Sequence, residues 1–431
     1  MKPKMSAHFE GLKPSATRIA QIMFEKRDGD IEAVNVAIGN VSLPMHPAMQ
    51  QRIKCLPRFS TGVVPYCSPA GYKETKDAFL NIISSCGHDT SKLHVHITDG
   101  GSAAMEYVIL GVCGPAGSTD QPLMLIDASY TNYHALARRT GRAIVTVTRE
   151  LREDGTFTLP DFNEMDQLIR KEKPNALVVI PYDNPTGHFL DQDDLVKFAE
   201  LCVVHNIWMI SDEAYREMHY VDKKGSSIWG ITEKDVPGIE GRRISIESAS
   251  KMWNACGIRV GALVTDNQLF HEKGVAESTG NLCSNVVGQE IFSAIADVPH
   301  VELHEWYQKQ RAYYKNMLTT FTADLRERLP GIIVSSPDAS LYSVVDVRKI
   351  AKPGFKAMDF VMYCAEKGSV EVEGKKMTLL VAPMAGFYKM KEGEKNPGQT
   401  QMRIAYVVSP EKIKLVPRLF TELFKSYEST R

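Results

Sequence analysis

The chain of 431 residues is too long for one ordinary domain and suits a large domain accompanied by a smaller one. Hydrophobic residues make up 43% of it, enough for a sizeable core, and the formal net charge of −1 gives no support for a nucleic-acid partner. No apolar run approaches the roughly 18 residues of a membrane span, and no signal segment opens the chain, so we expect a soluble protein without a membrane partner.

The eight cysteines are scattered through apolar sequence. None of them forms a Cys-x-x-Cys pair or a Cys/His spacing typical of a metal site, so no metal is predicted. Free thiols of this kind fit a reducing compartment, and we expect a cytoplasmic protein.

Between about residues 95 and 300, short apolar runs alternate with amphipathic helical stretches. This alternation predicts an α/β fold with a mostly parallel sheet and helices on both faces. In such a sheet, ligands bind where the strands end and the loops begin. The expected strands are 123–127, 144–147, 176–180, 207–211, 244–247 and 261–265, and the expected helices are 133–141, 162–173 and 195–204.

From about residue 302 the pattern changes to a long helical stretch at 303–329, followed by short strand candidates and a final helix at 410–427. This order is typical of an α+β domain that also takes up the N-terminal segment. The predicted division is therefore a large domain at 46–300 and a small domain made of 1–45 and 301–431.

A lysine stands just after the strand 244–247, in Ser248-Ala249-Ser250-Lys251, with Arg259 eight residues further on. A lysine amine among small hydroxyl residues suits imine formation with a carbonyl, provided that burial or a nearby cation keeps it neutral. Arg259 offers a fork for phosphate oxygens, and Ser248 and Ser250 offer hydroxyl donors. An ordinary surface lysine beside an arginine would explain this segment alone equally well.

Polar side chains also follow two other expected strands. Asp212 comes after 207–211, with Tyr215 three residues later, and Asn184-Pro185-Thr186-Gly187 comes after 176–180. A strand-end aspartate can face the nitrogen of a bound pyridine ring and keep it protonated, while Asn184 and Tyr215 could donate to an oxygen of that ring. The alternatives are a helix N-cap at Asp212 and a purely structural turn at Asn184.

A glycine pair, Gly100-Gly101, leads into Ser102 and Ala103 at the expected start of a helix. Glycines let the backbone approach an anion closely, and the free N–H groups of a helix start favour a phosphate. A Gly-Gly turn is weak evidence by itself.

The motifs gain meaning from their order: Gly-Gly-Ser, Asn-Pro-Thr-Gly, Asp-x-x-Tyr, Ser-x-Ser-Lys, and an arginine eight residues after the lysine. In this order the chain resembles the class I and II aminotransferases of fold type I, which use pyridoxal 5′-phosphate (PLP), and it is similar to the aspartate and aromatic amino-acid enzymes. The resemblance covers nearly the whole chain. It implies an α/β large domain with a mostly parallel, seven-stranded sheet sandwiched by helices, beside a smaller α+β domain.

The resemblance implies a role for each motif residue. Lys251 resembles the Schiff-base lysine that later shuttles a proton, Asp212 the partner of the ring nitrogen, and Asn184 and Tyr215 the donors to the ring oxygen. Tyr130 stands where the family stacks an aromatic side chain on the ring, although core packing would also explain it. The other positions implied to bind the cofactor, mostly its phosphate, are Gly101, Ser102, Ala103, Ser248, Ser250 and Arg259.

Outside this region, Arg403 resembles the arginine that grips the substrate α-carboxylate, and Gly39 belongs to a similar substrate loop; Asn184 is implied to contact the substrate as well. Tyr66 is similar to the tyrosine that reaches the phosphate in the neighbouring subunit, which implies a homodimer with shared active sites. The chain departs from the family at Asp183, where asparagine is frequent. No arginine near Asn285 plainly marks a dicarboxylate enzyme.

The expected reaction is a ping-pong transfer of an amino group from an L-amino acid, aspartate or an aromatic one, to a 2-oxo acid such as 2-oxoglutarate. A PLP-dependent lyase, decarboxylase or synthase of the same fold would share all these motifs. A PLP-sensing regulator would need a DNA-binding domain ahead of the aminotransferase region, and only about thirty residues precede the substrate loop.

Overall fold

The computed structural model describes residues 3–335 and 338–431, which form two compact units. The larger unit comprises Asn40–Thr319 and Ser335–Ser343, and the smaller one comprises Met1–Gly39, Thr320–Val334 and Val344–Arg431. Among the described residues, no helix combines the length and the apolar character that a membrane crossing requires.

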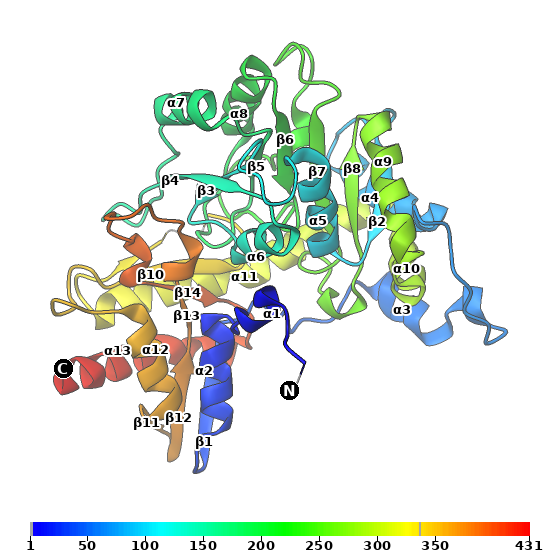
Figure 1. Ribbon diagram of the computed structural model, residues 1–431. Helices are drawn as coiled ribbons and strands as arrows, with labels where there is room; N and C mark the ends of the chain where they lie inside the picture. Colours follow the sequence, from blue (N-terminus) through cyan, green and yellow to red (C-terminus); the bar gives the residue numbers. More distant parts are fainter. Residues whose placement is uncertain (1–2, 336–337) are drawn as a thin grey trace. The chain divides into compact units, whose positions relative to one another are not determined.

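A seven-stranded sheet forms the centre of the larger unit (Figure 1), with the strand order β2-β8-β7-β6-β5-β3-β4. Every neighbouring pair is parallel except the two pairs made by β8, which runs antiparallel to β2 and β7. The predicted α/β class with a mostly parallel sheet is thereby confirmed. The strands are β2 (His94–Thr98), β3 (Leu123–Asp127), β4 (Ile144–Thr148), β5 (Ala176–Val179), β6 (Trp208–Asp212), β7 (Arg243–Ser248) and β8 (Gly261–Thr265).

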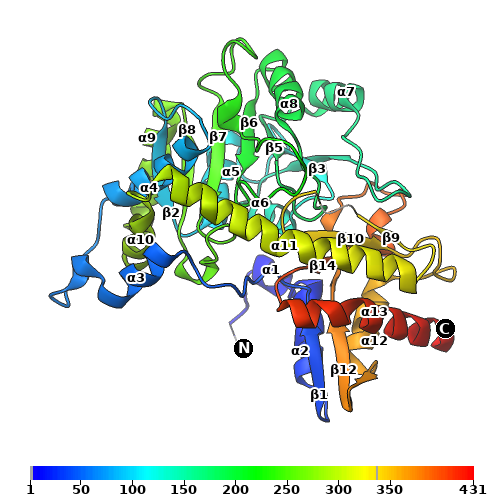
Figure 2. The ribbon, with the colours of Figure 1, turned by 180° about the vertical axis from the view of Figure 1, so that it is seen from behind.

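Helices cover both faces of this sheet (Figures 1 and 2). Crossovers between parallel strands are right-handed in nearly all proteins. In this sheet the chain reverses its direction of travel at the edge strand β4. Helices α5 (Gly101–Val112) and α6 (Thr131–Thr140), which precede that reversal, therefore lie on one face, and α7 (Phe162–Glu172) and α8 (Gln192–Val204) lie on the other.

The core between the sheet and α5 and α6 is a single apolar cluster. Val108 and Ile109 of α5 pack there against Leu125 of β3 and Ile246 of β7, and none of these side chains is more than 1% exposed. Burying such a side chain stabilises the fold by about 1.5–3 kcal/mol. The other helices of this unit are α3 (Pro47–Cys55), α4 (Lys73–Ser85), α9 (Gln268–Ser278), α10 (Val286–Phe292) and the first part of α11 (His300–Arg328).

Two small sheets belong mainly to the smaller unit. One has the order β1-β12-β11 and the other the order β13-β14-β10-β9, with β14 antiparallel to β13. The strands are β1 (Ile31–Asn35), β9 (Ile333–Val334), β10 (Tyr342–Asp346), β11 (Val370–Val372), β12 (Lys375–Leu380), β13 (Ala382–Pro383) and β14 (Gln401–Ala405). The helices are α1 (Ala7–Glu10), α2 (Ala16–Glu25), α12 (Ala357–Glu366) and α13 (Pro410–Thr430).

Candidate active site

One cavity in the larger unit gathers residues from the ends of five strands. Of the cofactor-binding residues predicted in this unit, all but Ala103 and Tyr66 line it. The lining consists of Gly101, Ser102, Met105, Tyr130, Asn132, Tyr133, Leu136, Ile180, Asn184, Asp212, Ala214, Tyr215, Ser248, Ser250, Lys251, Cys256 and Arg259.

Lys251 reaches this cavity from the loop that follows β7. The buried Ser248 ends the strand, and its Oγ accepts a hydrogen bond from the Ser250 N–H at 3.0 Å. The Lys251 carbonyl accepts from the Asn254 N–H at 3.1 Å, which closes the next turn of the loop. The sequence Ser-x-Ser-Lys therefore folds into consecutive tight turns that carry the lysine away from the sheet edge.

A cationic corner forms where the start of α5 meets Arg259. The Arg259 guanidinium donates to the carbonyls of Cys256 and Asp99, at 2.9 and 3.2 Å. A Cβ on Gly100 would lie 2.4 Å from Arg259 Nη2, so only glycine lets this loop and the guanidinium approach so closely. Ala103 lies on the same turn, but its N–H donates to the Gly100 carbonyl at 3.1 Å. A guanidinium, serine hydroxyls and a helix start together suit a phosphate group.

Asp212 lies at another part of the lining, at the end of β6. Its Oδ1 accepts from the Ala214 N–H at 3.1 Å, and its Oδ2 accepts from the Tyr133 hydroxyl. Burial raises the pKa of Asp212, while these two hydrogen bonds oppose the rise. No helix begins at this point of the chain, where residues 214–217 form turns, so the alternative of a helix N-cap at Asp212 is wrong.

The two predicted donors Asn184 and Tyr215 lie side by side and are both buried. Asn184 Nδ2 donates to the Tyr215 hydroxyl at 3.4 Å, and that hydroxyl also shares a hydrogen bond with the Tyr342 hydroxyl at 2.8 Å. The residue before Asn184, Asp183, forms a 2.5 Å ion pair with Arg149. The departure from asparagine at position 183 thus comes with a buried cation that compensates its charge.

An aromatic pair forms the start of α6. The Tyr130 ring lies 5.4 Å from the Tyr133 ring in a T-shaped arrangement, and the Tyr130 hydroxyl accepts from Asn132 Nδ2 at 2.8 Å. Tyr130 also packs against the apolar core, so the core-packing alternative describes part of its surroundings. Tyr133 was missed in the sequence, although it lies only three residues after Tyr130, the residue that precedes α6.

Two of the predicted substrate residues lie in the smaller unit. Arg403 on β14 is buried, and its Nη2 donates to the carbonyl of Ala37, two residues before Gly39, at 2.8 Å. Its guanidinium carbon lies 5.3 Å from the centre of the Phe387 ring. Within this unit the fold therefore brings together Arg403 and the chain segment that leads to Gly39.

Two further residues have clear surroundings in the larger unit. Tyr66 is 76% exposed, and its predicted contact with a neighbouring subunit stays a prediction. Asn285 caps α10, since its Oδ1 accepts from the Val287 and Gly288 N–H groups and its Nδ2 donates to the Ile258 carbonyl. Within residues 3–335 and 338–431, no group of three or more His, Cys, Asp or Glu side chains is arranged to hold a metal ion.

The fold and this cavity define an enzyme with a lysine and an aspartate at the strand ends of an α/β sheet. A model of the family "Aminotransferase class I and II" matches residues 43–413, and the protein therefore belongs to this family. The family assignment inferred from the motifs is confirmed.

The relatives include enzymes of more than one activity. The aspartate aminotransferase of Pyrococcus horikoshii is 25% identical over 398 residues, covering 91% of this chain and 90% of the relative. The cystathionine beta-lyase PatB of Bacillus subtilis is 21% identical over 347 residues, covering 80% of this chain and 84% of the relative.

Solved structures share the whole fold at low identity. A mutant of the Thermus thermophilus aspartate aminotransferase matches 98% of this chain with a TM-score of 0.78 and 19% identity. The N-succinyldiaminopimelate aminotransferase from Mycobacterium tuberculosis matches 97% with a TM-score of 0.79 and 20% identity. The chain covers 100% of each of these structures. At such identities the likeness establishes the fold.

Proposed function

We propose that the protein is a PLP-dependent aminotransferase that moves the amino group of aspartate to 2-oxoglutarate by a ping-pong mechanism. The observation that carries the proposal is the single cavity in which Lys251, Asp212 and Arg259 meet. The name of the Pyrococcus relative, which this chain covers for 90% of its length, supports aspartate as the donor.

The donors around the cavity fit PLP at each of its polar groups. Arg259, Ser248 and the start of α5 at Gly101 offer charge and hydrogen bonds for a phosphate. Asp212 offers a carboxylate for a protonated ring nitrogen, whose positive charge would oppose the effect of burial on the Asp212 pKa. The adjacent Asn184 and Tyr215 offer donors for a ring oxygen.

When bound, the pyridine ring would supply an electron sink for the bonds of the substrate α-carbon. Lys251 would hold the cofactor through its amine. As a free amine, Lys251 Nζ would be a neutral base that takes the proton of the substrate α-carbon and later returns it. Asp212 would keep the ring nitrogen protonated, and Tyr133, by donating to Asp212, would keep that carboxylate charged and oriented.

The substrate contacts follow from the resemblance. Arg403 would bind the α-carboxylate through two parallel charge-assisted hydrogen bonds, which fix its orientation as well as its affinity. Asn184 and the Gly39 loop would complete this set. Profiling the twenty amino acids against 2-oxoglutarate tests the donor, and a preference for alanine, an aromatic or a branched-chain donor would contradict aspartate.

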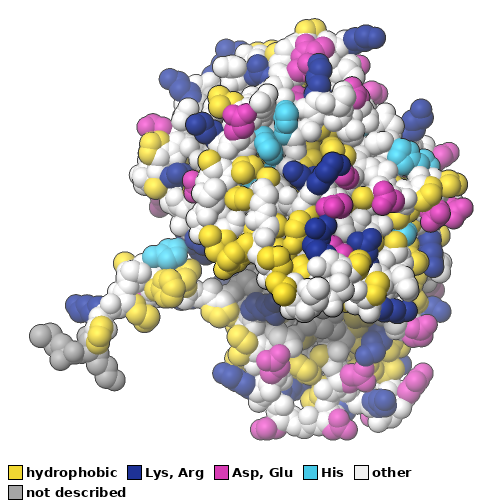
Figure 3. Space-filling view, turned by 90° about the vertical axis from the view of Figure 1, so that its right-hand side faces the viewer, with side chains coloured by type: hydrophobic (Ala, Val, Ile, Leu, Met, Phe, Trp, Pro, Cys, Tyr) yellow, Lys and Arg dark blue, Asp and Glu magenta, His cyan; other side chains and the backbone are white. Residues whose placement is uncertain are grey.

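A homodimer with a shared active site is part of the proposal. Figure 3 views the side of the molecule that carries α9 and α10 in Figure 1, and hydrophobic side chains gather over part of it. The segment around Tyr66 is apolar and open to solvent, with Val63 at 64% and Val64 at 54% exposure. Exposed apolar surface of this kind is typical of interaction sites.

All eight cysteines are unbonded thiols, which supports a cytoplasmic location.

The direct test of the lysine uses reductive trapping. The purified enzyme should be yellow, and borohydride should bleach it and leave the cofactor on the peptide that contains Lys251. Lys251→Ala should lose transamination, whereas Lys273→Ala, an exposed lysine on α9, should retain it. Transamination by Lys251→Ala at a near wild-type rate would refute the assignment.

A lyase reaction is a second candidate because the Bacillus relative that covers 80% of the chain bears that name. The two reactions differ in their need for an acceptor. A β-lyase releases ammonia and pyruvate from a sulfur amino acid without a 2-oxo acid, whereas transamination stops after one turnover without one. Multiple turnovers with cystathionine alone would replace the aminotransferase proposal with the lyase.

A further inference from the structure

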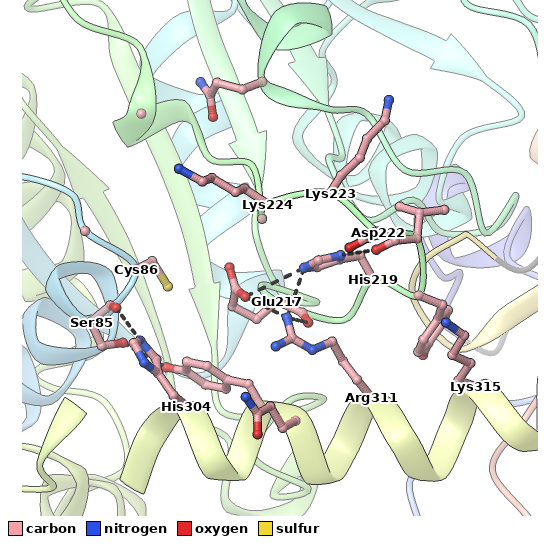
Figure 4. Close-up of a pocket in the computed structure, with 18 of the residues that line it drawn as sticks. Ser85, Cys86, Glu217, His219, Asp222, Lys223, Lys224, His304, Arg311 and Lys315 are labelled. Atoms are coloured by element: carbon pink, nitrogen blue, oxygen red, sulfur yellow. Dashed lines mark hydrogen bonds and ion pairs between the residues drawn. The ribbon is translucent and has the colours of Figure 1, made fainter. Parts of the chain in front are cut away.

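A second and larger cavity opens in the larger unit, with a volume of about 920 Å³. It shares no lining residue with the cavity that contains Lys251. Its walls come from the end of α4, the loop after β6 and the first part of α11 (Figure 4). Pockets that bind small organic molecules measure roughly 300–1,000 Å³, so this cleft is large enough for an organic molecule and much more than a simple ion needs.

Arg311 of α11 lies in the cleft with its orientation fixed by one nitrogen. Its Nη1 donates to Glu217 Oε2 at 3.0 Å and to His219 Nε2 at 2.9 Å. Glu217 adopts the left-handed region with φ +66°. A Cβ on Gly225 would lie 1.9 Å from Glu217 Oε1, so a glycine there leaves room for the carboxylate. The contact between Glu217 and Arg311 therefore depends on a strained backbone at Glu217 and on the absence of a side chain at Gly225.

The other edge of the guanidinium faces away from these partners. Figure 4 shows one terminal nitrogen of Arg311 directed at Glu217 and His219 and the other directed away from both. Among residues 3–335 and 338–431, no hydrogen-bond partner of Arg311 Nη2 or Nε was found. Because only Nη1 is engaged, Nη2 and Nε remain as a planar pair of donors that can bind two oxygens of an oxyanion.

Lysines stand on two walls around this arginine. Lys315 lies one helical turn beyond it on α11, and Lys223 and Lys224 lie on the loop after β6. Lys223 pairs with Asp191 at 2.6 Å, whereas Lys224 and Lys315 extend from exposed positions. The lining contains four cationic side chains, three lysines and Arg311, and two acidic ones, Glu217 and Asp222. Asp191, outside the lining, neutralises Lys223, so one positive charge remains in excess.

Of the three histidines in the lining, His88, His219 and His304, the first adds no positive charge to this balance. Burial lowers the pKa of His88 to about 4, and the charge of Arg216 adds to this effect, so His88 is neutral at pH 7. A ligand with negative charge is favoured by the remaining excess of cations. Donors on two walls suit the tetrahedral oxygens of a phosphate, which point in several directions, better than one planar carboxylate.

We propose that this cleft binds the phosphate group of a small organic phosphate, with Arg311 as the fixed donor and with Lys224 and Lys315, whose long side chains can turn toward the phosphate, as further donors. The remaining volume takes the organic body of the molecule, against Val221, Tyr307 and Ala312. The chemistry of the phosphate is shared by free phosphate and by phosphate esters. The size of the cleft favours the ester.

The test is titration calorimetry on the PLP-loaded enzyme, in which the proposed cofactor phosphate site is already filled. Adenosine 5′-monophosphate and inorganic phosphate are the two probes, and adenosine is the uncharged control. We expect one adenosine monophosphate per chain with a dissociation constant below about 1 mM, tighter than inorganic phosphate, and no binding of adenosine. Equal affinity for the two phosphates would support the phosphate site and assign it to free phosphate.

Variants locate the binding. The double variant Lys224→Ala/Lys315→Ala changes exposed side chains only, and Arg311→Met removes the guanidinium; each should weaken binding at least about tenfold. Lys309→Ala is the matched control, since Lys309 lies on the same helix but outside the lining, and its binding should equal wild type. No binding of either phosphate at 10 mM, or binding that the double variant leaves unchanged, overturns the proposal.

Discussion

The ion pair between Arg149 and Asp183 is a buried contact on which the stability of the larger unit should depend. Their side chains are 5% and 2% exposed, and the two charged atoms lie 2.5 Å apart. Arg149 Nη2 also donates to the Ala128 carbonyl at 3.0 Å, and Asp183 accepts from the Thr186 hydroxyl. The pair thus joins the segment before Tyr130 to the segment that carries Asn184.

Removing one partner of a buried pair leaves the other charge in a place where water cannot reach it. Such losses cost about 3–5 kcal/mol of the free energy of unfolding, and we expect this for Arg149→Met at pH 7. The double variant Arg149→Met/Asp183→Asn removes both charges and should recover most of the loss. Arg152→Met, three residues away and exposed, should change the free energy by no more than about 0.5 kcal/mol.

The same argument sets the direction of the pH dependence. Burial raises the pKa of Asp183 in the folded protein, and the charge of Arg149 opposes the rise. Without Arg149 the folded pKa rises further above the unfolded value, so the variant takes up a proton on folding. Its stability is then highest at low pH and falls as the pH rises from the unfolded pKa toward the folded one. Arg149→Met should therefore lose less relative to wild type at pH 5 than at pH 8.

Urea unfolding followed by tryptophan fluorescence measures these differences in the free energy of unfolding for the larger unit of the protein. All four tryptophans belong to the larger unit, so the signal reports on the part of the chain that contains the pair: Trp208, Trp229, Trp253 and Trp306. If Arg149→Met lowers the free energy of unfolding by less than about 1 kcal/mol at pH 7, the reasoning is refuted, because an unpaired buried charge should destabilise the fold by more than that. A loss that grows toward pH 5 would refute the assigned sign.

Three other variants test the site and its surroundings. Tyr133→Phe removes the hydroxyl that opposes the raised pKa of Asp212, so kcat should fall about tenfold or more and the acid limb of its pH profile should move to higher pH, while KM stays constant. Burial raises the pKa of Glu213 to about 7 in the folded protein. As the pH rises from 5 to 7, the free energy of unfolding of wild type should therefore fall relative to that of Glu213→Gln, by up to about 1.4 kcal/mol per pH unit, as measured by urea unfolding. Gly261→Ala would place a Cβ 2.6 Å from the Gly101 N atom and should weaken PLP at least about tenfold in a spectroscopic titration; unchanged affinity would contradict the phosphate corner.

The buried strands were the easiest elements to predict from the sequence. β3 and β8 begin and end where the sequence predicted, because strands covered on both faces are apolar at nearly every position and only the last residues, Asp127 and Thr265, are polar. β2 was missed, since its sequence His-Val-His-Ile-Thr has no continuous apolar run. His96 is nonetheless buried there, where burial lowers its pKa to about 4 and leaves the ring neutral. A neutral imidazole can occupy an apolar position that a charged one cannot.

The site residues were predictable to the extent that each follows a strand in the sequence. Lys251, Asp212 and Asn184 are marked by that position and by local motifs. Tyr133 was not, because its partner Asp212 is 79 residues away and only the folded sheet brings them together. The pairing of Arg149 with Asp183 has the same cause. The cleft around Arg311 draws on segments from residue 85 to residue 315, none of which carries a motif.

The direction of β8 explains why Arg259 stands before a strand while the other site residues follow theirs. The site lies on the side of the sheet where the parallel strands have their carboxyl ends. There Gly261, the first residue of β8, pairs with Thr98 and Ser248, the last residues of β2 and β7. An antiparallel strand begins where its neighbours end, so a residue just ahead of it reaches the same edge as residues just after them. A cation placed after β8 would have been delivered to the opposite edge, far from Lys251. The spacing of eight between lysine and arginine therefore measures the loop that turns the chain from the end of β7 into the start of β8, and lengthening that loop would separate the amine from the phosphate corner without changing either residue.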